Sequence, residues 1–287
     1  MDNLRELNLC KLNIENPLLS ITLLVSDRKE VEKTLESLTN LRRRVKSELI
    51  VVDTGCSEAV LDIIKRYTDK IYKFKWINDF AAARNECVKY ATGKWILYLD
   101  DDEWFEDTAE IEDFFLLGTY KRYCVCKYIQ RNYHDMTGLR YSDDYVSRMA
   151  KLSPVMHFEG CIHEYMIVED TTTAIVNSYV HHYGYVYKSE EDKYKHSVRN
   201  LTLLNKMIEK EPDNYSWWFH AAQEYWSLKE YDKLNEISRN ALHRFEKKSD
   251  DNFNVILASF YMFIIEGFFN TYKFEEAIQE GKRALED

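Results

Sequence analysis

The sequence is poor in the residues that break regular structure, with only 8 glycines and 3 prolines among 287 residues. With 45% hydrophobic and 31% charged residues, the chain is not a disordered protein, and its length fits one large or two modest globular domains. It is also short of positive charge, since the formal net charge is −10. Phosphate backbones require clustered Lys and Arg, so this balance argues against nucleic acid as a partner.

Long apolar runs are missing as well. No window approaches the roughly 20 apolar residues of a transmembrane segment, and the N-terminus lacks the charged-then-apolar order of a signal peptide. A cytoplasmic protein is therefore expected. The 6 cysteines lack metal-ligand spacing and are interpreted as reduced thiols. No nucleophile elbow or paired glycosidase pattern is found, which disfavours a hydrolase, and the SDRK segment at 26–29 lacks the glycine of a nucleotidyltransferase phosphate loop.

Three consecutive aspartates are the main positive feature of the sequence. Asp100, Asp101 and Asp102 follow the apolar run 95–99, and Glu103 comes next. Open α/β sheets bind ligands at the carboxyl ends of their strands. Carboxylates at this density repel one another unless a positive charge lies among them, and Mn²⁺ or Mg²⁺ prefers such oxygen ligands. The run favours a metal-bound phosphate substrate; the alternative is a solvated acidic turn.

The first hundred residues alternate between strand and helix patterns. Strands are predicted over 20–25, 49–52, 70–75 and 95–99, and helices over 29–38 and 80–90. This alternation predicts an α/β fold with right-handed βαβ units. Asp53, which ends the second strand, is then expected to face the same crevice as the aspartate run. Ser57 and Asp79 are the expected caps of the helices that follow them.

From residue 186 onward the pattern is helical only. Apolar positions predict a helix over 193–210, and residues 218–241 follow the tetratricopeptide pattern of a helical hairpin. A looser copy covers 254–285. Such arrays need stacked neighbours, so this one is expected to pack on the catalytic domain or on a second copy of the chain, as a homodimer. The predicted domains are an N-terminal extension (1–18), an α/β domain (19–185) and an all-α tetratricopeptide-like domain (186–287).

Three motifs in order carry a resemblance to a known family. They are VVDTG at 51–55, NDFAAARN at 78–85 and GKWILYLDDDE at 93–103, followed by FEGCIHE at 158–164 and HYGY at 182–185. Together they resemble the family 2 glycosyltransferases. The chain is similar to the bacterial subgroup that joins a glycosyltransferase domain to tetratricopeptide repeats, which includes enzymes that glycosylate cysteine or serine of glycocin peptides. The resemblance implies a Rossmann-like GT-A domain that binds a nucleotide sugar.

The resemblance also implies a reaction and its donor-side residues. A metal-dependent, inverting glycosyltransferase would move a sugar from a nucleotide-diphosphate donor, expected to be a UDP-sugar, to a peptide, protein or glycan. Asp53 would contact the base or ribose. Asp100 and Asp102, with Asp101 between them, match the family's Asp-x-Asp pattern, which binds Mn²⁺ or Mg²⁺ at the diphosphate. Arg84 would hold a phosphate or the sugar.

The acceptor side needs a base that takes the proton of the attacking group. Glu164 is the first candidate and His163 is assigned a further metal or phosphate contact, although these roles are interchangeable, and Glu159 is a third candidate base. If His163 and Glu164 lie on a strand, they point to opposite faces and only one reaches the site. Further expected neighbours of the site are Trp104, beside the nucleotide sugar, and one of His181 and His182.

A contrasting interpretation is a catalytically inactive protein-binding module. In that case the helical repeats carry the function and the nucleotide-sugar domain is a relic. The acids retained at Asp53, Asp100 and Asp102 argue against it.

Overall fold

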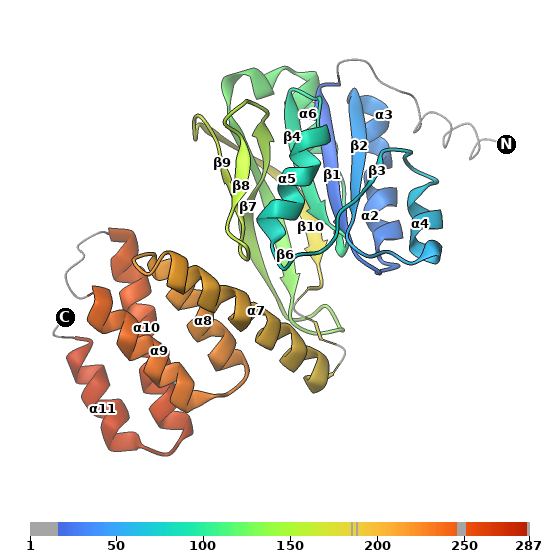
Figure 1. Ribbon diagram of the computed structural model, residues 1–287. Helices are drawn as coiled ribbons and strands as arrows, with labels where there is room; N and C mark the ends of the chain where they lie inside the picture. The colour runs from blue at the N-terminus through green and yellow to red at the C-terminus, as the bar shows by residue number, and fades with distance from the viewer. Residues whose placement is uncertain (1–16, 185, 188, 246–250, 286–287) are drawn as a thin grey trace. The chain divides into compact units, whose positions relative to one another are not determined.

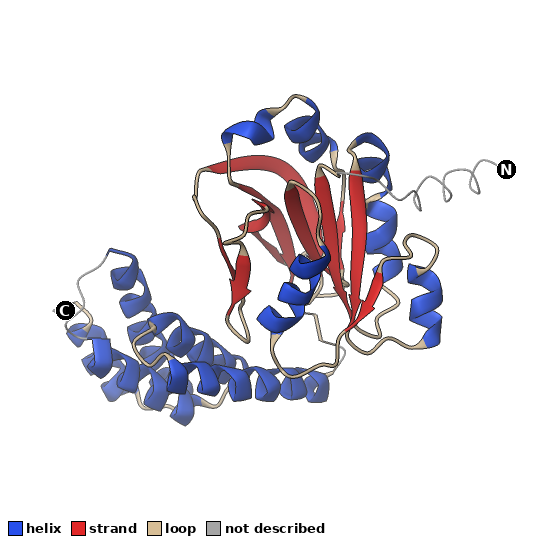
Figure 2. Cartoon of the chain, turned by 45° about the horizontal axis from the view of Figure 1, so that its top comes forward, coloured by secondary structure: helices blue, strands red, loops and turns tan. Residues whose placement is uncertain are grey.

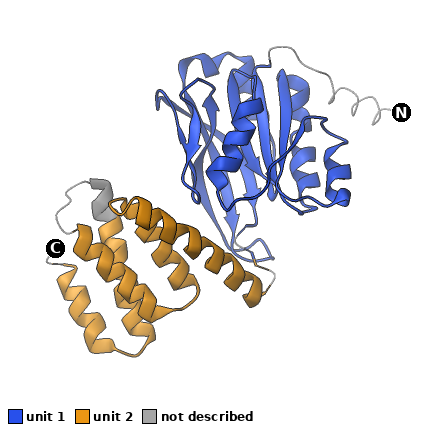
Figure 3. Ribbon diagram, in the orientation of Figure 1, with its two compact units in different colours: residues 1–186 blue, residues 187–287 orange. Residues whose placement is uncertain are grey.

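The structure is a computed structural model that describes residues 17–184, 186, 187, 189–245 and 251–285. The chain divides into two compact units, residues 1–186 and residues 187–287 (Figure 3). The domains expected from the sequence meet one residue earlier, between 185 and 186. Most of the expected N-terminal extension, residues 1–16, lies outside the described residues.

An eight-stranded mixed sheet forms the centre of the first unit (Figure 1). Its strand order is β3-β2-β1-β4-β7-β6-β10-β5, and β3, β2, β1 and β4 run parallel. β7 is antiparallel to both β4 and β6, so the sheet has a parallel half and a mixed half. The predicted α/β class is confirmed. The strands are β1 (Leu19–Val25), β2 (Ser47–Asp53), β3 (Ile71–Lys73), β4 (Trp95–Asp100), β5 (Glu103–Phe105), β6 (Val125–Tyr133), β7 (Tyr141–Lys151) and β10 (Thr173–His182), with a separate hairpin of β8 (His157–Glu159) and β9 (Tyr165–Ile167).

Both faces of the parallel half are covered, as Figure 2 shows. Alternate residues of β1 point to opposite sides: Leu23 belongs to the largest apolar core, whereas Leu24 packs in a second cluster with Cys87 of α5. Apolar residues on both sides explain why the strands read as continuous hydrophobic runs. The first face carries α2 (Val31–Ser37), α3 (Thr39–Arg44), α4 (Glu58–Ile64) and α6 (Ala109–Leu116), followed by the short helix η1 (Thr119–Arg122); the second carries α5 (Phe80–Tyr90) and the β8–β9 hairpin.

Aspartate side chains form the turns at two of the predicted helix starts. α5 has its predicted bounds, and the amide of Ala82 donates to the carboxylate of Asp79 at 2.8 Å, which confirms the predicted cap. Ser57 is the N-cap residue of α4, as predicted, but its side chain makes no capping hydrogen bond. Asp53 Oδ1 instead accepts the amides of Gly55 and Cys56 at 2.9 and 2.7 Å, so the strand's own terminal carboxylate closes this turn.

β4 and β7 separate partway along β4. The ladder pairs Trp95, Ile96 and Leu97 with β7, whereas pairing with β1 continues to Asp100. Beyond Leu97 the gap is bridged by a side chain, since Tyr98 Oη donates to the carbonyl of Ser147 at 3.0 Å. The sheet therefore opens beside the last residues of β4.

The second unit is helical, as predicted from residue 186 onward, and each helix packs on the next (Figure 1). Leu234, Ala241, Phe245, Phe260 and Ile264 form its buried core. None of the described helices is long and apolar enough to cross a membrane. The helices are α7 (Glu190–Lys210), α8 (Tyr215–Ser227), α9 (Tyr231–Phe245), α10 (Asp251–Asn270) and α11 (Phe274–Arg283).

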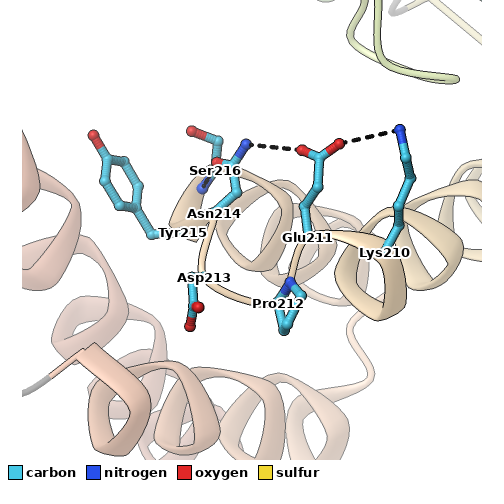
Figure 4. A pocket seen from close by; sticks show the side chains of 7 residues that line it. All are labelled: Lys210, Glu211, Pro212, Asp213, Asn214, Tyr215 and Ser216. Atoms are coloured by element: carbon cyan, nitrogen blue, oxygen red, sulfur yellow. Dashed lines mark hydrogen bonds and ion pairs between the residues drawn. The ribbon is translucent and has the colours of Figure 1, made fainter.

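A hollow of about 570 Å³ lies at the turn between α7 and α8 (Figure 4). Its polar side chains bind within the turn itself: Asn214 accepts the amide of Ser216 at 3.2 Å, and Glu211 accepts Trp217 Nε1 at 3.0 Å. These contacts hold the two helices together. The hollow contains none of the predicted site residues.

Candidate active site

The two acidic strand ends lie at the same edge of the sheet. β1 runs between β2 and β4, with Val25 in register with Asp53 and Leu24 in register with Asp100. The loop after β1 contacts both sides: Ser26 bonds to Asp101 of the acidic segment, and Asp27 accepts the amide of Ser57 beyond β2 at 2.9 Å. One crevice edge thus gathers the acids that the sequence places after separate strands.

Each carboxylate of the aspartate run has different partners. Asp101 is buried, and its Oδ2 accepts both the amide and the hydroxyl of Ser26 at 2.7 Å. Burial raises the pKa of Asp101 to about 6, although Arg28 and Ser26 oppose the shift. Asp102 forms an ion pair with Arg28, whose side chain is 40% exposed.

Asp100 is held by two arginines. Its Oδ1 pairs with Nη2 of Arg84, and its Oδ2 lies 3.3 Å from Nη2 of Arg148. Burial opposes ionisation, but the two guanidiniums outweigh it and lower the pKa of Asp100 well below its usual range. Arg84 is itself buried, and its fork also donates from Nε to Glu164 at 3.0 Å and from Nη1 to the carbonyl of Leu99 at 3.2 Å.

Glu103 is fully buried beneath this group and complements Arg148. Its Oε1 lies 3.2 Å from Arg148 Nη2 and accepts from Gln130, while its Oε2 accepts the amide of Asp100 at 3.0 Å. The ring of Tyr98 lies against both Arg84 and Arg148, 4.8 and 4.7 Å from their guanidinium carbons. The acidic end of β4 is therefore charge-balanced from within the fold.

His163 and Glu164 lie in the loop between β8 and β9, so the alternation expected for a strand does not apply to them. Gly160 and His163 both have positive φ, at 92° and 49°, which turns the chain out of the extended conformation. Glu164 reaches the Arg84 guanidinium, whereas His163 is exposed. Glu159, the third candidate base, ends β8 and is exposed.

Trp104 lies on β5, next in the chain to Glu103 and opposite His181 of β10. Its ring stacks on Tyr183 with 5.3 Å between centroids, and the Lys33 ammonium lies 4.9 Å from it. Since successive strand residues face opposite sides, Trp104 and Glu103 point to different faces. The placement of Trp104 beside the nucleotide sugar stays a prediction.

The two neighbouring histidines also diverge. His182 is in register with Glu103 and makes a 2.6 Å hydrogen bond through Nδ1 to Asn132. His181 Nδ1 bonds instead to Tyr133 Oη at 2.7 Å. Of this pair, His182 is the one on the side of the acidic segment.

The predicted cation ligands are not gathered into one group. Over the described part of the chain, no three His, Cys, Asp or Glu residues lie close enough together to hold a metal ion, so Asp100, Asp102 and His163 do not form a ready ligand set. Both carboxylate oxygens of Asp100 pair with arginines, Arg84 and Arg148, whose side chains are largely buried. Asp101 and Asp102 offer hard oxygen donors that suit Mn²⁺ or Mg²⁺, but the contact between Asp102 and Arg28 must first open.

Sequence reasoning missed Arg28, Arg148 and Glu103 as parts of this site. It recognised that clustered carboxylates need positive charge and assigned that charge to a metal ion. Arginines 28, 84 and 148 supply it in the structure. The available signal was an arginine in the loop after the first strand, at the same sheet edge as the aspartates.

Comparison with known proteins identifies a family pattern in part of the chain and several relatives. Residues 24–150 match the model for glycosyl transferase family 2. The SPbeta prophage-derived glycosyltransferase SunS of Bacillus subtilis is 29% identical over 238 residues, which cover 78% of this chain and 53% of SunS. The chain thus spans about half the length of that relative.

Two further similarities are to a repeat-containing protein and to a solved structure. A TPR repeat-containing protein of Synechococcus elongatus is 39% identical over 83 residues, 29% of this chain and 20% of that protein. The crystal structure of S. aureus TarS 1–349 aligns with a TM-score of 0.44 and 11% identity over 87% of this chain and 80% of that one. Residues 24–150, which contain both acidic strand ends, therefore carry the sequence pattern of glycosyl transferase family 2.

Proposed function

We propose that this chain is a glycosyltransferase that uses a nucleotide-diphosphate sugar, with uridine as the expected base, to modify a peptide, protein or glycan. One observation carries the proposal. Within a family 2 glycosyltransferase domain, Asp53 and the aspartate run end neighbouring parallel strands, and the loop after β1 binds to both ends. Such an edge can accept the polar groups of a nucleoside on one side and its phosphates on the other.

The nucleoside is assigned to Asp53. Its Oδ1 is used by the Gly55 and Cys56 amides, which fixes the direction of the carboxylate. Its Oδ2 is the oxygen proposed to accept a hydrogen bond from the base or ribose. Burial opposes ionisation of Asp53, but these amides outweigh it and lower its pKa, so the acceptor is charged at neutral pH.

The diphosphate is assigned to the aspartate run. Asp102 is the residue proposed to hold a Mn²⁺ or Mg²⁺ ion, with Asp100 or Asp101 beside it and His163 as a further contact. When bound, such an ion neutralises charge on the departing nucleoside diphosphate. Arg84 and Arg148 fix the direction of Asp100, so the acidic end of β4 keeps its shape without help from a ligand.

Removal of the acceptor's proton is assigned to Glu164, as the base of an inverting transfer. A base in this role must be ionised and fixed near the attacking atom. The Arg84 guanidinium contacts the Glu164 carboxylate at 3.0 Å and fixes its direction. The same guanidinium binds Asp100, so the proposed base and the donor-side acid are held by one buried group. We therefore propose that Arg84 positions both acids. This role takes the place of the direct contact with the donor that the resemblance implied.

The helical unit is proposed to bind the acceptor peptide or protein, or to pair with a second copy of the chain. Its helical-hairpin architecture supports this role, because stacked hairpins form extended binding surfaces.

Turnover of a panel of nucleotide sugars with Mn²⁺, with candidate peptides followed by mass spectrometry, tests the proposal. We expect Asp102→Asn to lower donor turnover by at least tenfold, because the substitution removes one charged ligand of the ion that neutralises the leaving group. Glu164→Gln is expected to abolish transfer while donor binding persists. Asp62→Asn, an exposed carboxylate paired with Lys65, is the matched control and should behave as wild type. A wild-type protein that neither binds nor consumes any donor would favour the inactive binding module.

A further inference from the structure

The three guanidiniums that balance the aspartate run differ sharply in exposure. The side chains of Arg84 and Arg148 are 2% and 16% exposed, whereas that of Arg28 is 40% exposed. Arg84 and Arg148 are also tied to other partners, the partly buried Glu164 and the fully buried Glu103. Arg28 is the member of this trio that solvent and ligands reach.

The loop that carries Arg28 is fixed independently of its side chain. Ser26 binds Asp101 through both its amide and its hydroxyl at 2.7 Å, and the neighbouring Asp27 accepts the amide of Ser57 at 2.9 Å. These contacts hold the backbone on either side of the crevice edge. The Arg28 side chain can therefore leave Asp102 by rotation about its own bonds, without any change in the loop.

Arg28 lies where a bound cation would neutralise the aspartates. Its Nη1 pairs with Asp102 Oδ2 and lies 3.8 Å from Asp101 Oδ1. A guanidinium and a divalent ion cannot use the same carboxylate oxygen, and they repel each other across a few ångströms. Since an arginine stays protonated at any physiological pH, Arg28 cannot relieve this conflict by losing its charge.

We propose that Arg28 is an exchangeable counterion: it neutralises Asp101 and Asp102 in the absence of a divalent ion and must leave Asp102 when that ion binds. The inference rests on the cation role of the proposed function and adds a residue that sets how tightly the cation is held. Metal affinity in the free protein is then lower than the two carboxylates alone would give. The released guanidinium stays at the crevice edge, next to the proposed diphosphate position.

Binding of Mn²⁺ alone, without nucleotide, tests the proposal, with unbound Mn²⁺ measured by electron paramagnetic resonance. We expect Arg28→Gln to bind Mn²⁺ roughly tenfold more tightly than wild type, because one charge-assisted contact no longer competes. Arg28→Lys, which keeps the charge but not the planar fork, is expected to lie between them. Arg66→Gln removes the same charge from an exposed pair with Glu32 and should leave the affinity unchanged.

A double variant locates the effect. In the Arg28→Gln/Asp102→Asn protein the gain should disappear, because the competition is for the Asp102 carboxylate. The proposal is overturned if Arg28→Gln binds Mn²⁺ no more tightly than wild type, if Arg66→Gln gains equally, or if the gain survives in the double variant. Failure of both wild type and Arg28→Gln to bind Mn²⁺ overturns it as well.

Donor turnover separates this inference from the proposed function. An unchanged Mn²⁺ affinity in Arg28→Gln, with a wild-type protein that consumes a nucleotide sugar, removes the counterion role and leaves the glycosyltransferase in place. A tenfold gain in Mn²⁺ affinity in Arg28→Gln, with a wild-type protein that consumes no donor, supports the counterion role and removes the proposed glycosyltransferase activity.

Discussion

Replacing Arg84 with methionine tests whether this buried guanidinium balances Asp100 and Glu164. Methionine fills much of the same space without charge, so the substitution removes the ion pairs and the hydrogen bond to the Leu99 carbonyl. Breaking a buried pair by removing one partner costs about 3–5 kcal/mol. Asp100 keeps Arg148 and is 31% exposed, whereas Glu164 is 13% exposed and loses its contact at 3.0 Å. We therefore expect the lower end of that range, about 3 kcal/mol.

Pulse proteolysis in urea measures this cost in the first unit alone when fragments from β4 and from α9 are quantified separately. Arg66→Met is the control, since its exposed pair with Glu32 is worth less than about 1 kcal/mol. Adding Glu164→Gln to Arg84→Met should recover about 1 kcal/mol, because the unpaired carboxylate is gone. The reasoning is refuted if Arg84→Met costs no more than Arg66→Met, or if the second substitution recovers nothing.

Three further predictions concern stability in the same assay. Burial opposes ionisation of Glu48, but its hydrogen-bond donors outweigh burial and lower its pKa from 4.5. Its contribution to the free energy of unfolding is therefore present above pH 4.5 and lost on acidification. Glu48→Gln should reduce this loss of stability at low pH. Burial raises the pKa of Asp101 from 3.8 to about 6, so its contribution is present below pH 3.8 and lost as the pH rises through 6; Asp101→Asn should remove this decline, and an unchanged profile would contradict the assignment. A Cβ at Gly93 would lie 2.7 Å from the Ser20 amide nitrogen, so Gly93→Ala should cost about 3 kcal/mol, whereas Gly281→Ala in α11, with its nearest neighbour at 3.9 Å, should stabilise by about 0.5–1 kcal/mol. Equal effects of the two glycine substitutions would show that the close approach at Gly93 is relieved by movement of the backbone.

The parallel half of the sheet was predictable because its determinants are local. Continuous apolar runs identify β1, β2 and β4, since both of their faces are buried. Asp79 fixed the start of α5 through a single capping hydrogen bond. The edge shared by Asp53 and the aspartate run then followed from βαβ topology alone.

The rest depended on contacts between distant parts of the chain. The separation of β4 from β7 after Leu97 depends on where a later strand pairs, and no local pattern records it. The positive φ at His163, in the loop that carries the candidate base Glu164, has no signal in the local sequence. The pairing of Arg28 with Asp102 spans 74 positions in the sequence, so the charges could be counted beforehand but not matched.

The divergence of β4 and β7 has a consequence for redesign of this protein. The ladder with β7 ends at Leu97 whereas the ladder with β1 continues to Asp100, so this divergence is set by strand pairing and not by any one side chain. Tyr98 and Arg148 bond to Ser147, Asp100 and Glu103 beside this divergence, so substitutions there would also cost stability. A variant library on this framework would keep both residues and vary an exposed neighbour such as Arg28.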